Sequence, residues 1–195
     1  ISMKAWKRVG ETLQLPTSDE FILSLIGRTR KDQQVVFDSY MPKGWPQEEA
    51  CSLHTQFKKE EKLKNGVPLM GDVKGLLDTV KAKGYTIAMA TSASAEDVEF
   101  NLNNAGIQHY FEAIISDEMI THGKPAPDVY LKTAQQLNLS PQECLVVEDS
   151  LNGVRAAFGA GTTVVMIPDK VQPTKEIKAM CNYILKSLDD LKEIV

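Results

Sequence analysis

The sequence is poor in the residues that crosslink a chain or bind zinc. Its 195 residues include three cysteines, and no two of them stand in a short pair. Such spacing excludes a typical zinc site and a disulfide framework. Isolated cysteines of this kind are typical of small buried apolar residues in a reducing compartment, so we expect a cytoplasmic protein. The cysteines are Cys51, Cys144 and Cys181.

Histidine is scarce as well, and its three occurrences have no metal-ligand spacing. His54, His109 and His122 are therefore predicted to be surface or loop residues. No apolar run is long enough to span a bilayer, and no signal peptide is recognisable. The chain begins Ile1-Ser2-Met3, inside a predicted helix, which favours a processed or partial sequence.

Basic blocks are also missing. The formal net charge is -4, with 22 Lys and Arg against 26 Asp and Glu. An acidic chain does not steer phosphodiester polymers or anionic lipid surfaces toward itself, so we expect no nucleic-acid or membrane partner. Hydrophobic residues make up 43% of the chain, which is ordinary for a globular protein. The length suffices for one well-packed domain and a smaller one, while the oligomeric state cannot be read from the sequence.

The chain divides near residue 67 into two regions with different patterns. Residues 1–67 have four apolar runs at helical spacing and no convincing strand, which predicts a small helical domain. Residues 68–195 alternate short apolar strands with helices. That alternation predicts a parallel sheet covered on both faces, a three-layer α/β/α sandwich of Rossmann-like topology. The four helices of the first region are predicted at 2–14, 21–26, 30–41 and 46–64.

The second region has five predicted strands and five predicted helices. The strands are expected at 85–90, 113–116, 144–148, 163–167 and 183–185. The helices are expected at 71–83, 94–105, 127–137 and 150–158, with a last one after Ser187. Because ligands of parallel sheets bind at the carboxyl ends of the strands, polar residues directly after these strands are the candidates for a site.

The first polar cluster, Thr91-Ser92-Ala93-Ser94, follows the predicted strand 85–90. A hydroxyl of Thr91 or Ser92 can donate a hydrogen bond to a phosphate oxygen. The unpaired amides where the next helix begins also favour anions. The alternative interpretation is that Thr91, Ser92 and Ser94 only cap that helix.

The second candidate is Lys124, in Gly123-Lys124-Pro125-Ala126-Pro127-Asp128. Pro125 disfavours the helical conformation at the residue before it, so Lys124 is expected in an extended loop ahead of helix 127–137. A lysine held there can neutralise a phosphate or a group of carboxylates. The alternative is an ordinary solvated lysine before a helix that starts with proline.

The third candidate is the pair Glu148-Asp149, which ends a predicted buried strand. Adjacent carboxylates at such a position repel one another unless a cation lies beside them. Oxygen ligands of this kind suit Mg²⁺. The alternative is that Asp149 or Ser150 only caps helix 150–158.

A hydroxyl, a lysine and an acidic pair in this chain order resemble motifs of the haloacid-dehalogenase superfamily. The resemblance is greatest to the branch that contains β-phosphoglucomutase and related sugar-phosphate phosphatases. Residues 90–94 are similar to the second motif of this family, Lys124 to the third, and 148–150 with Asn152-Gly153 to the fourth. In this family the bond between the motif lysine and the following proline is often cis, and we expect a cis Lys124-Pro125 bond here.

The resemblance implies a Mg²⁺-dependent phosphohydrolase that acts on a small phosphorylated metabolite such as a sugar phosphate. Thr91, with the backbone of Ser92 and Ala93, would hold the transferring phosphoryl group, and Lys124 would offset its charge. Residues 1–67 resemble the helical cap domain of this family, and residues 68–195 its α/β core.

Metal and substrate contacts are implied in the same way. Asp149 would bind Mg²⁺ directly, and Glu148 would bind it directly or through water. Arg28, within Ile26-Gly27-Arg28-Thr29, stands where a cap arginine often faces the substrate.

The first motif of the family is absent from the sequence. That motif is a strand ending in Asp-x-Asp, whose first Asp is the nucleophile and forms an aspartyl-phosphate, and whose second is the general acid/base. No Asp-x-Asp occurs in the 195 residues, and we expect it upstream of Ile1. Its strand belongs between 85–90 and 144–148, which should therefore face an unfilled slot.

Two other functions remain open at this point. A β-phosphoglucomutase-type phosphotransferase differs by protecting the aspartyl-phosphate from water. A non-catalytic protein could keep the phosphate pocket without any nucleophile. Residues 1–195 by themselves are expected to lack phosphatase activity.

Overall fold

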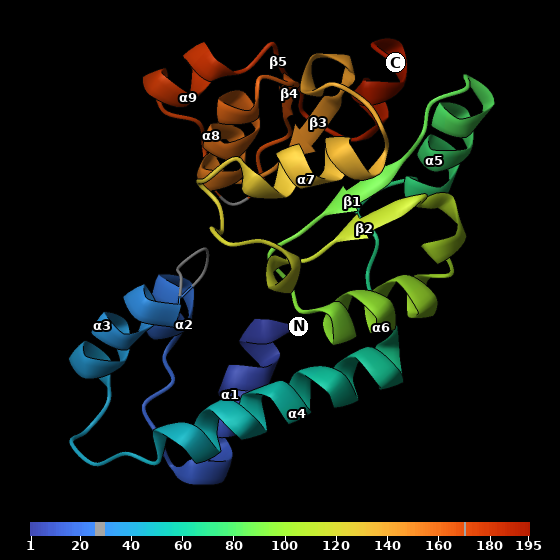
Figure 1. Ribbon diagram of the computed structural model, residues 1–195. Helices are drawn as coiled ribbons and strands as arrows, with labels where there is room; N and C mark the ends of the chain where they lie inside the picture. The colour runs from blue at the N-terminus through green and yellow to red at the C-terminus, as the bar shows by residue number, and fades with distance from the viewer. Residues whose placement is uncertain (26–29, 170) are drawn as a thin grey trace. The chain divides into compact units, whose positions relative to one another are not determined.

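The computed structural model describes residues 1–25, 30–169 and 171–195 (Figure 1). They form two compact units, Ile1–Val67 and Pro68–Val195. The helical unit, residues 1–67, contains only helices among its described residues, and the α/β unit, residues 68–195, contains all the described strands. The predicted mixed α/β class is confirmed.

The helical unit contains four helices close to the predicted ones. Its apolar residues gather around Trp6, whose ring meets Phe21 edge-on at a centroid distance of 5.6 Å and Phe37 at 5.9 Å. Burial of these aromatic rings together with the aliphatic residues around them stabilises the helical unit. The helices are α1 (Ser2–Leu13), α2 (Asp19–Leu25), α3 (Arg30–Tyr40) and α4 (Gln47–Asn65).

His54 is not the surface or loop residue that the sequence predicts. It lies on α4, where it is half-buried, and its ring stacks on Trp6 at a centroid distance of 4.4 Å. Its Nε2 lies 3.0 Å from Ser2 Oγ. Partial burial, followed by the charge of Lys58, lowers the pKa of His54 to about 4. The neutral ring is therefore part of the folded helical unit.

The α/β unit alternates strands and helices, as predicted. Its strands are β1 (Ala88–Ala90), β2 (Ala113–Ile115), β3 (Leu145–Glu148), β4 (Thr163–Met166) and β5 (Tyr183–Ile184). Its α-helices are α5 (Val73–Ala82), α6 (Ala95–Ala105), α7 (Asp128–Gln136), α8 (Leu151–Ala160) and α9 (Lys175–Met180). Short 3₁₀ helices are η1 (Gln108–Tyr110), η2 (Asp117–Met119), η3 (Pro141–Glu143) and η4 (Asp189–Glu193).

Three details of these elements differ from the prediction. Strand β1 covers only the last part of the predicted range 85–90. The helix expected after Ser187 is the 3₁₀ helix η4, and α9 was not predicted at all. The start of α9 is fixed by Thr174, whose side chain accepts a hydrogen bond from the Ile177 amide.

The strands form two parallel sheets rather than one. One sheet has the order β1-β2, and the other has the order β3-β4-β5. Within the described part of the chain, β1 pairs only with β2, and β3 pairs only with β4 along one of its edges. Leu145 and Val147 of β3 are 38% and 37% exposed, whereas Val164 of β4 is fully buried. In the described residues, one edge of β1 and one edge of β3 are thus open sheet edges.

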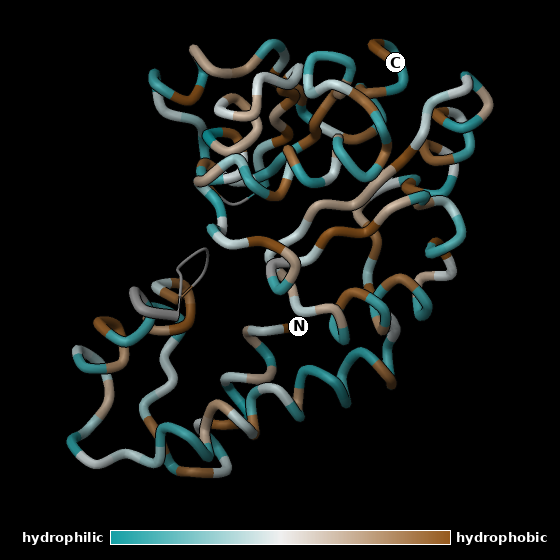
Figure 2. Tube along the Cα trace, viewed as in Figure 1, coloured by the Kyte–Doolittle hydropathy of each residue, from teal (hydrophilic) through white to brown (hydrophobic). Residues whose placement is uncertain are grey.

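Apolar residues cluster on the strands and on the helix faces that cover them (Figure 2). The cysteines contribute less to these clusters than predicted, because all three are free thiols that are only half-buried. Among the described residues, no helix has the length and apolar character needed to cross a membrane.

The low pKa of His54 predicts a pH-dependent stability of the helical unit. The folded pKa of about 4 lies below the value of 6.5 for an unperturbed histidine. The unfolded chain therefore binds a proton first as the pH falls. The stabilisation is fully present above pH 6.5 and is lost between pH 6.5 and 4, by at most about 3 kcal/mol. His54→Gln should remove this part of the pH dependence.

Urea unfolding followed by tryptophan fluorescence measures the effect. Both tryptophans of the sequence, Trp6 and Trp45, lie in the helical unit, so the signal reports on that unit. His109→Gln, in the α/β unit, is the matched control and should leave the pH dependence intact. An unfolding midpoint that falls equally with pH in wild type and His54→Gln contradicts the prediction.

Candidate functional site

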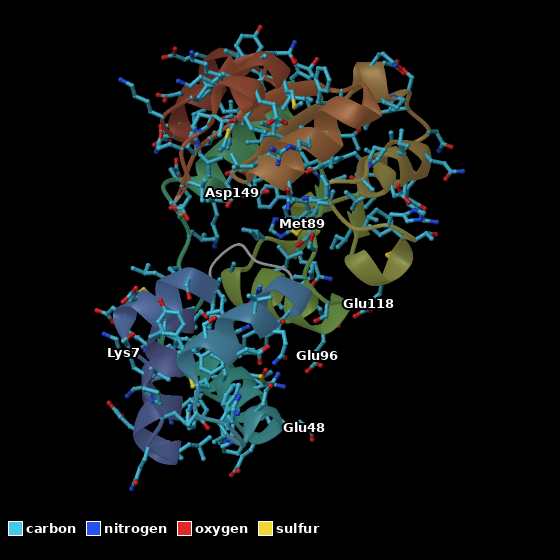
Figure 3. The ribbon with its side chains drawn as sticks, turned by 90° about the vertical axis from the view of Figure 1, so that its left-hand side faces the viewer. Lys7, Glu48, Met89, Glu96, Glu118 and Asp149 are labelled. Carbon is cyan, nitrogen blue, oxygen red and sulfur yellow. The ribbon has the colours of Figure 1, made fainter. Side chains whose placement is uncertain are left out.

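One cavity of about 750 Å³ in the α/β unit is lined by five of the predicted site residues, Thr91, Ser92, Lys124, Glu148 and Asp149. Thr91, Lys124 and Asp149 all line it, although they follow different elements of the chain. Figure 3 labels two of the lining residues, Met89 and Asp149. The cavity lies where the carboxyl ends of parallel strands meet, which is the usual ligand position in such a fold.

The sequence interpretation missed the part of the cavity that follows β4 and β5. Asp169 and Lys186 bring further charged groups to its wall, and Met70 brings an apolar one. The position of Asp169 and Lys186 shortly after β4 and β5 was the available signal. It was overlooked because neither segment contains a recognisable motif.

The hydroxyl residues that follow β1 have two different roles, since some line the cavity and one caps α6. Thr91 continues the pairing of β1 with β2, because its amide donates to the Ile115 carbonyl at 3.0 Å, and both Thr91 and Ser92 line the cavity. Ser94 caps α6 by accepting a hydrogen bond from the Asp97 amide, so the capping interpretation is correct for this residue.

Ala93 departs from the predicted phosphate-binding set. It is not among the residues that line the cavity, and its amide already donates to Thr91 Oγ1 at 3.1 Å. That hydrogen bond is local, two residues apart, as hydroxyl residues commonly make near a helix start. The Ala93 amide is therefore engaged within the chain.

Lys124 is held inside the protein and is not a solvated loop lysine. The predicted cis bond between Lys124 and Pro125 is confirmed. The lysine side chain is only 13% exposed. Its Nζ donates to Glu148 Oε1 at 2.5 Å and to the Ala90 carbonyl oxygen at 3.4 Å. The lysine thus links the loop before α7 to the ends of both β1 and β3.

Glu148 is buried, and both of its carboxylate oxygens are used by donors of the chain. Oε1 accepts from Lys124 Nζ and from the Tyr130 hydroxyl. Oε2 accepts from Ser150 Oγ at 3.0 Å and from the amides of Asp149 and Ser150 at 3.2 and 3.3 Å. A carboxylate offers about four lone-pair positions, so these five donors saturate it. Direct metal ligation by Glu148 is therefore not what this arrangement favours, contrary to one of the two predicted modes.

The charges around Glu148 keep it ionised. Burial alone raises the pKa of this carboxyl, but the Lys124 ammonium and the hydrogen bonds from Lys124, Tyr130 and Ser150 outweigh burial. The pKa of Glu148 therefore lies below its ordinary value. A buried anion saturated in this way acts as a fixed support for the lysine.

Asp149 is open to solvent at the cavity wall. Partial desolvation raises the pKa of its carboxyl, and the negative charges of Glu148 and Asp169 raise it further. Asp149 does not cap α8, since that task falls to Ser150, whose Oγ accepts from the Gly153 amide at 3.0 Å. Its carboxylate thus carries a charge that a cation in the cavity would stabilise.

Two further predictions concern a metal ion and the substrate contact of Arg28. Among the described residues, no group of three or more His, Cys, Asp or Glu side chains is arranged to hold a metal ion. Arg28 lies outside the described residues.

Comparison with known proteins identifies the family of the chain. The family model of haloacid dehalogenase-like hydrolases matches residues 1–167. The chain belongs to this family. The resemblance seen in the sequence motifs is thus confirmed at the level of the family.

Relatives within the haloacid dehalogenase-like family include several phosphatases. The chain is 27% identical over 161 residues to a phosphorylated carbohydrates phosphatase of Thermotoga maritima, covering 81% of this chain and 73% of that protein. It is 36% identical over 140 residues to a protein of Drosophila melanogaster described as a probable pseudouridine-5'-phosphatase, covering 68% and 59%. It spans only 31% of a bifunctional riboflavin kinase/FMN phosphatase of Arabidopsis thaliana.

Solved structures of the haloacid dehalogenase-like type share the fold. CbbY of Rhodobacter sphaeroides, crystallised with phosphate, superposes with a TM-score of 0.79 at 25% identity, covering 97% of this chain and 88% of CbbY. A Thermotoga maritima protein provisionally assigned as a β-phosphoglucomutase gives a TM-score of 0.81 at 24% identity, covering 100% and 92%. The fold class is therefore that of the haloacid dehalogenase-like proteins.

The contact between Gly153 and Glu148 yields a second prediction. A Cβ atom added at Gly153 would lie 2.0 Å from Cδ of Glu148, closer than any real contact. Gly153→Ala should therefore displace the Glu148 carboxylate from its donors and lower the free energy of unfolding of the α/β unit by about 1–3 kcal/mol.

Gly159→Ala is the matched control on the same helix. Its added Cβ would lie 3.7 Å from Pro127 Cβ, an ordinary contact, and alanine favours a helix interior by up to about 1 kcal/mol over glycine. Thermal unfolding followed by far-ultraviolet circular dichroism should separate the two variants. Equal midpoints for both would show that Glu148 does not need the space above Gly153.

Proposed function

We propose that the intact protein is a Mg²⁺-dependent phosphohydrolase of small phosphorylated metabolites such as sugar phosphates. The observation that carries this proposal is the convergence of Thr91, Lys124 and Asp149 on one cavity at the carboxyl ends of the strands. Membership of the haloacid dehalogenase-like family and the phosphatases among its relatives support the same reaction class.

Thr91 and Ser92 would hold the transferring phosphoryl group with hydroxyl and amide donors. Lys124 would offset the negative charge of the phosphoryl group, from a position that Glu148 fixes. Fixed donors and charges of this kind stabilise a transition state without rearranging during the reaction.

The carboxylates that line this cavity are suitable ligands for Mg²⁺. Asp149 has a raised pKa that a bound cation would lower, and Asp169 and Asp189 add carboxylate oxygens to the cavity. Oxygen donors are the ligands that Mg²⁺ prefers, and it commonly keeps waters and phosphate oxygens in its shell. Asp149 would bind the ion, which would neutralise charge on the phosphoryl group.

The nucleophile is proposed to stand on a strand that pairs with both β1 and β3. Support comes from the two separate parallel sheets and from the exposed side chains of β3. One parallel strand between β1 and β3 would give a single sheet and would end beside Thr91 and Asp149. An Asp at that end could attack phosphorus to form an aspartyl-phosphate, which water then hydrolyses.

A β-phosphoglucomutase-type phosphotransferase is the second candidate, favoured by the likeness to the provisionally assigned Thermotoga maritima protein. Turnover of β-glucose 1-phosphate with a bisphosphate primer separates it from a phosphatase. A non-catalytic phosphate-binding protein is the third, and it fails if the gene encodes an Asp-x-Asp ahead of Ile1.

The third prediction concerns the chain of residues 1–195 by itself. It should show no phosphatase activity, because Thr91 and Ser92 have no adjacent base and none of the motifs in these residues supplies a carboxylate nucleophile. Purified protein of confirmed mass is assayed with Mg²⁺ and an aryl phosphate. Turnover comparable to an ordinary phosphatase would place the nucleophile within these residues.

The fourth prediction concerns Asp149 in the full-length gene product. Asp149→Asn should lower kcat/KM by about 100-fold or more and weaken Mg²⁺ binding measured by calorimetry, because the amide removes the charge that would bind the ion. Glu112→Gln, which alters an exposed ion pair with Lys81, is the control and should change neither quantity. Unchanged Mg²⁺ affinity in Asp149→Asn would remove this residue from the metal site.

A further inference from the structure

Tyr130 is not one of the predicted site residues, yet its side chain contacts two of them, Glu148 and Lys124. It stands in the first turn of α7 and is 6% exposed. Its hydroxyl donates to Glu148 Oε1, the same oxygen that accepts from Lys124 Nζ. The Lys124 Nζ also lies 4.9 Å from the centroid of the Tyr130 ring. Tyr130 therefore contacts both members of the ion pair.

The ammonium group of Lys124 is confined on several sides. It has three N–H donors, and the Glu148 carboxylate and the Ala90 carbonyl accept two of them. The face of the Tyr130 ring attracts the ammonium by a cation–π interaction. One N–H is left over from these contacts for a ligand in the cavity that Lys124 lines.

The Tyr130 hydroxyl also keeps the Glu148 carboxylate from turning. Ser150 fixes Oε2, and Tyr130 fixes Oε1 together with the lysine. Without the hydroxyl, Lys124 would be the remaining donor to Oε1 among these contacts, and the pair could move as a unit. A lysine side chain has many rotamers and gains entropy when it is released.

We propose that Tyr130 is a positioning residue for Lys124. Its hydroxyl fixes Glu148, and its ring confines the ammonium, so that the lysine keeps one N–H available to an anion in the cavity. The proposal rests on the proposed function only for the identity of that anion.

Trace acetylation of the full-length protein tests the position of Lys124 without substrate or metal. Acetic anhydride acylates the unprotonated amine, so the labelling of a lysine rises when its side chain becomes accessible and its ammonium is released from its partners. Mass spectrometry gives the ratio of labelling at Lys124 to labelling at Lys132, an exposed lysine on α7. This ratio should rise at least about threefold in Tyr130→Phe, which loses one hydrogen bond to a charged group. It should rise further in Tyr130→Leu, which also loses the ring.

Tyr110→Phe is the matched control. Tyr110 is 9% exposed, donates its hydroxyl to Asp78 Oδ1 at 2.6 Å and does not line the cavity. Its substitution removes a comparable hydrogen bond and should leave the labelling ratio unchanged. An unchanged or lowered ratio in folded Tyr130→Phe overturns the proposal. An equal rise in Tyr110→Phe also overturns it, because the effect would then follow general destabilisation.

A second measurement separates this proposal from the proposed function. Calorimetry with inorganic phosphate and Mg²⁺ should show affinity weakened by about threefold or more in Tyr130→Phe, and no change in Tyr110→Phe. Wild-type protein that binds no phosphate would contradict the proposed function, while the labelling ratio would still decide the role of Tyr130. Full phosphate affinity in Tyr130→Phe would overturn the role of Tyr130 in presenting the lysine.

Discussion

The buried carboxylate of Glu148 is the interaction on which the arrangement of the site depends. It ends β3, and it receives donors from the loop before α7, from α7 itself and from the start of α8. An ionised group this deeply buried is stable only when its hydrogen-bonding positions are filled. Because its donors come from separate segments, the carboxylate fixes where those segments meet. The open Asp149 next to it can then be devoted to a ligand.

Glu148 and Asp149 are adjacent in sequence but have different roles, because their surroundings differ. The charge of Lys124 and the hydrogen bonds from Lys124 and Tyr130 lower the pKa of Glu148 in spite of its burial. Partial desolvation, followed by the negative charges of Glu148 and Asp169, raises the pKa of Asp149. The surroundings of two adjacent carboxyl groups thus shift their pKa values in opposite directions. One is satisfied by the chain, and the other favours a cation from outside.

Much of the fold could be predicted because it depends on local signals. Apolar spacing and helix caps such as Ser94 and Ser150 gave the order of strands and helices. The saturation of Glu148 could not be predicted, since it depends on Tyr130, which is distant in sequence and carries no local sign of its contact. The stacking of His54 on Trp6 was missed for the same reason, because it joins two helices that are far apart in the chain.

In the part of the chain that the structure describes, β1 and β3 each have one unpaired edge, which has a consequence for handling the protein. Each edge presents backbone amides and carbonyls in an extended row, and β3 adds the exposed apolar side chains of Leu145 and Val147. Such an edge is a template for any other extended chain, including a second copy of itself. A form of the protein in which these edges stay open would therefore carry an aggregation hazard. The boundaries chosen for expression would decide whether soluble material is obtained at all.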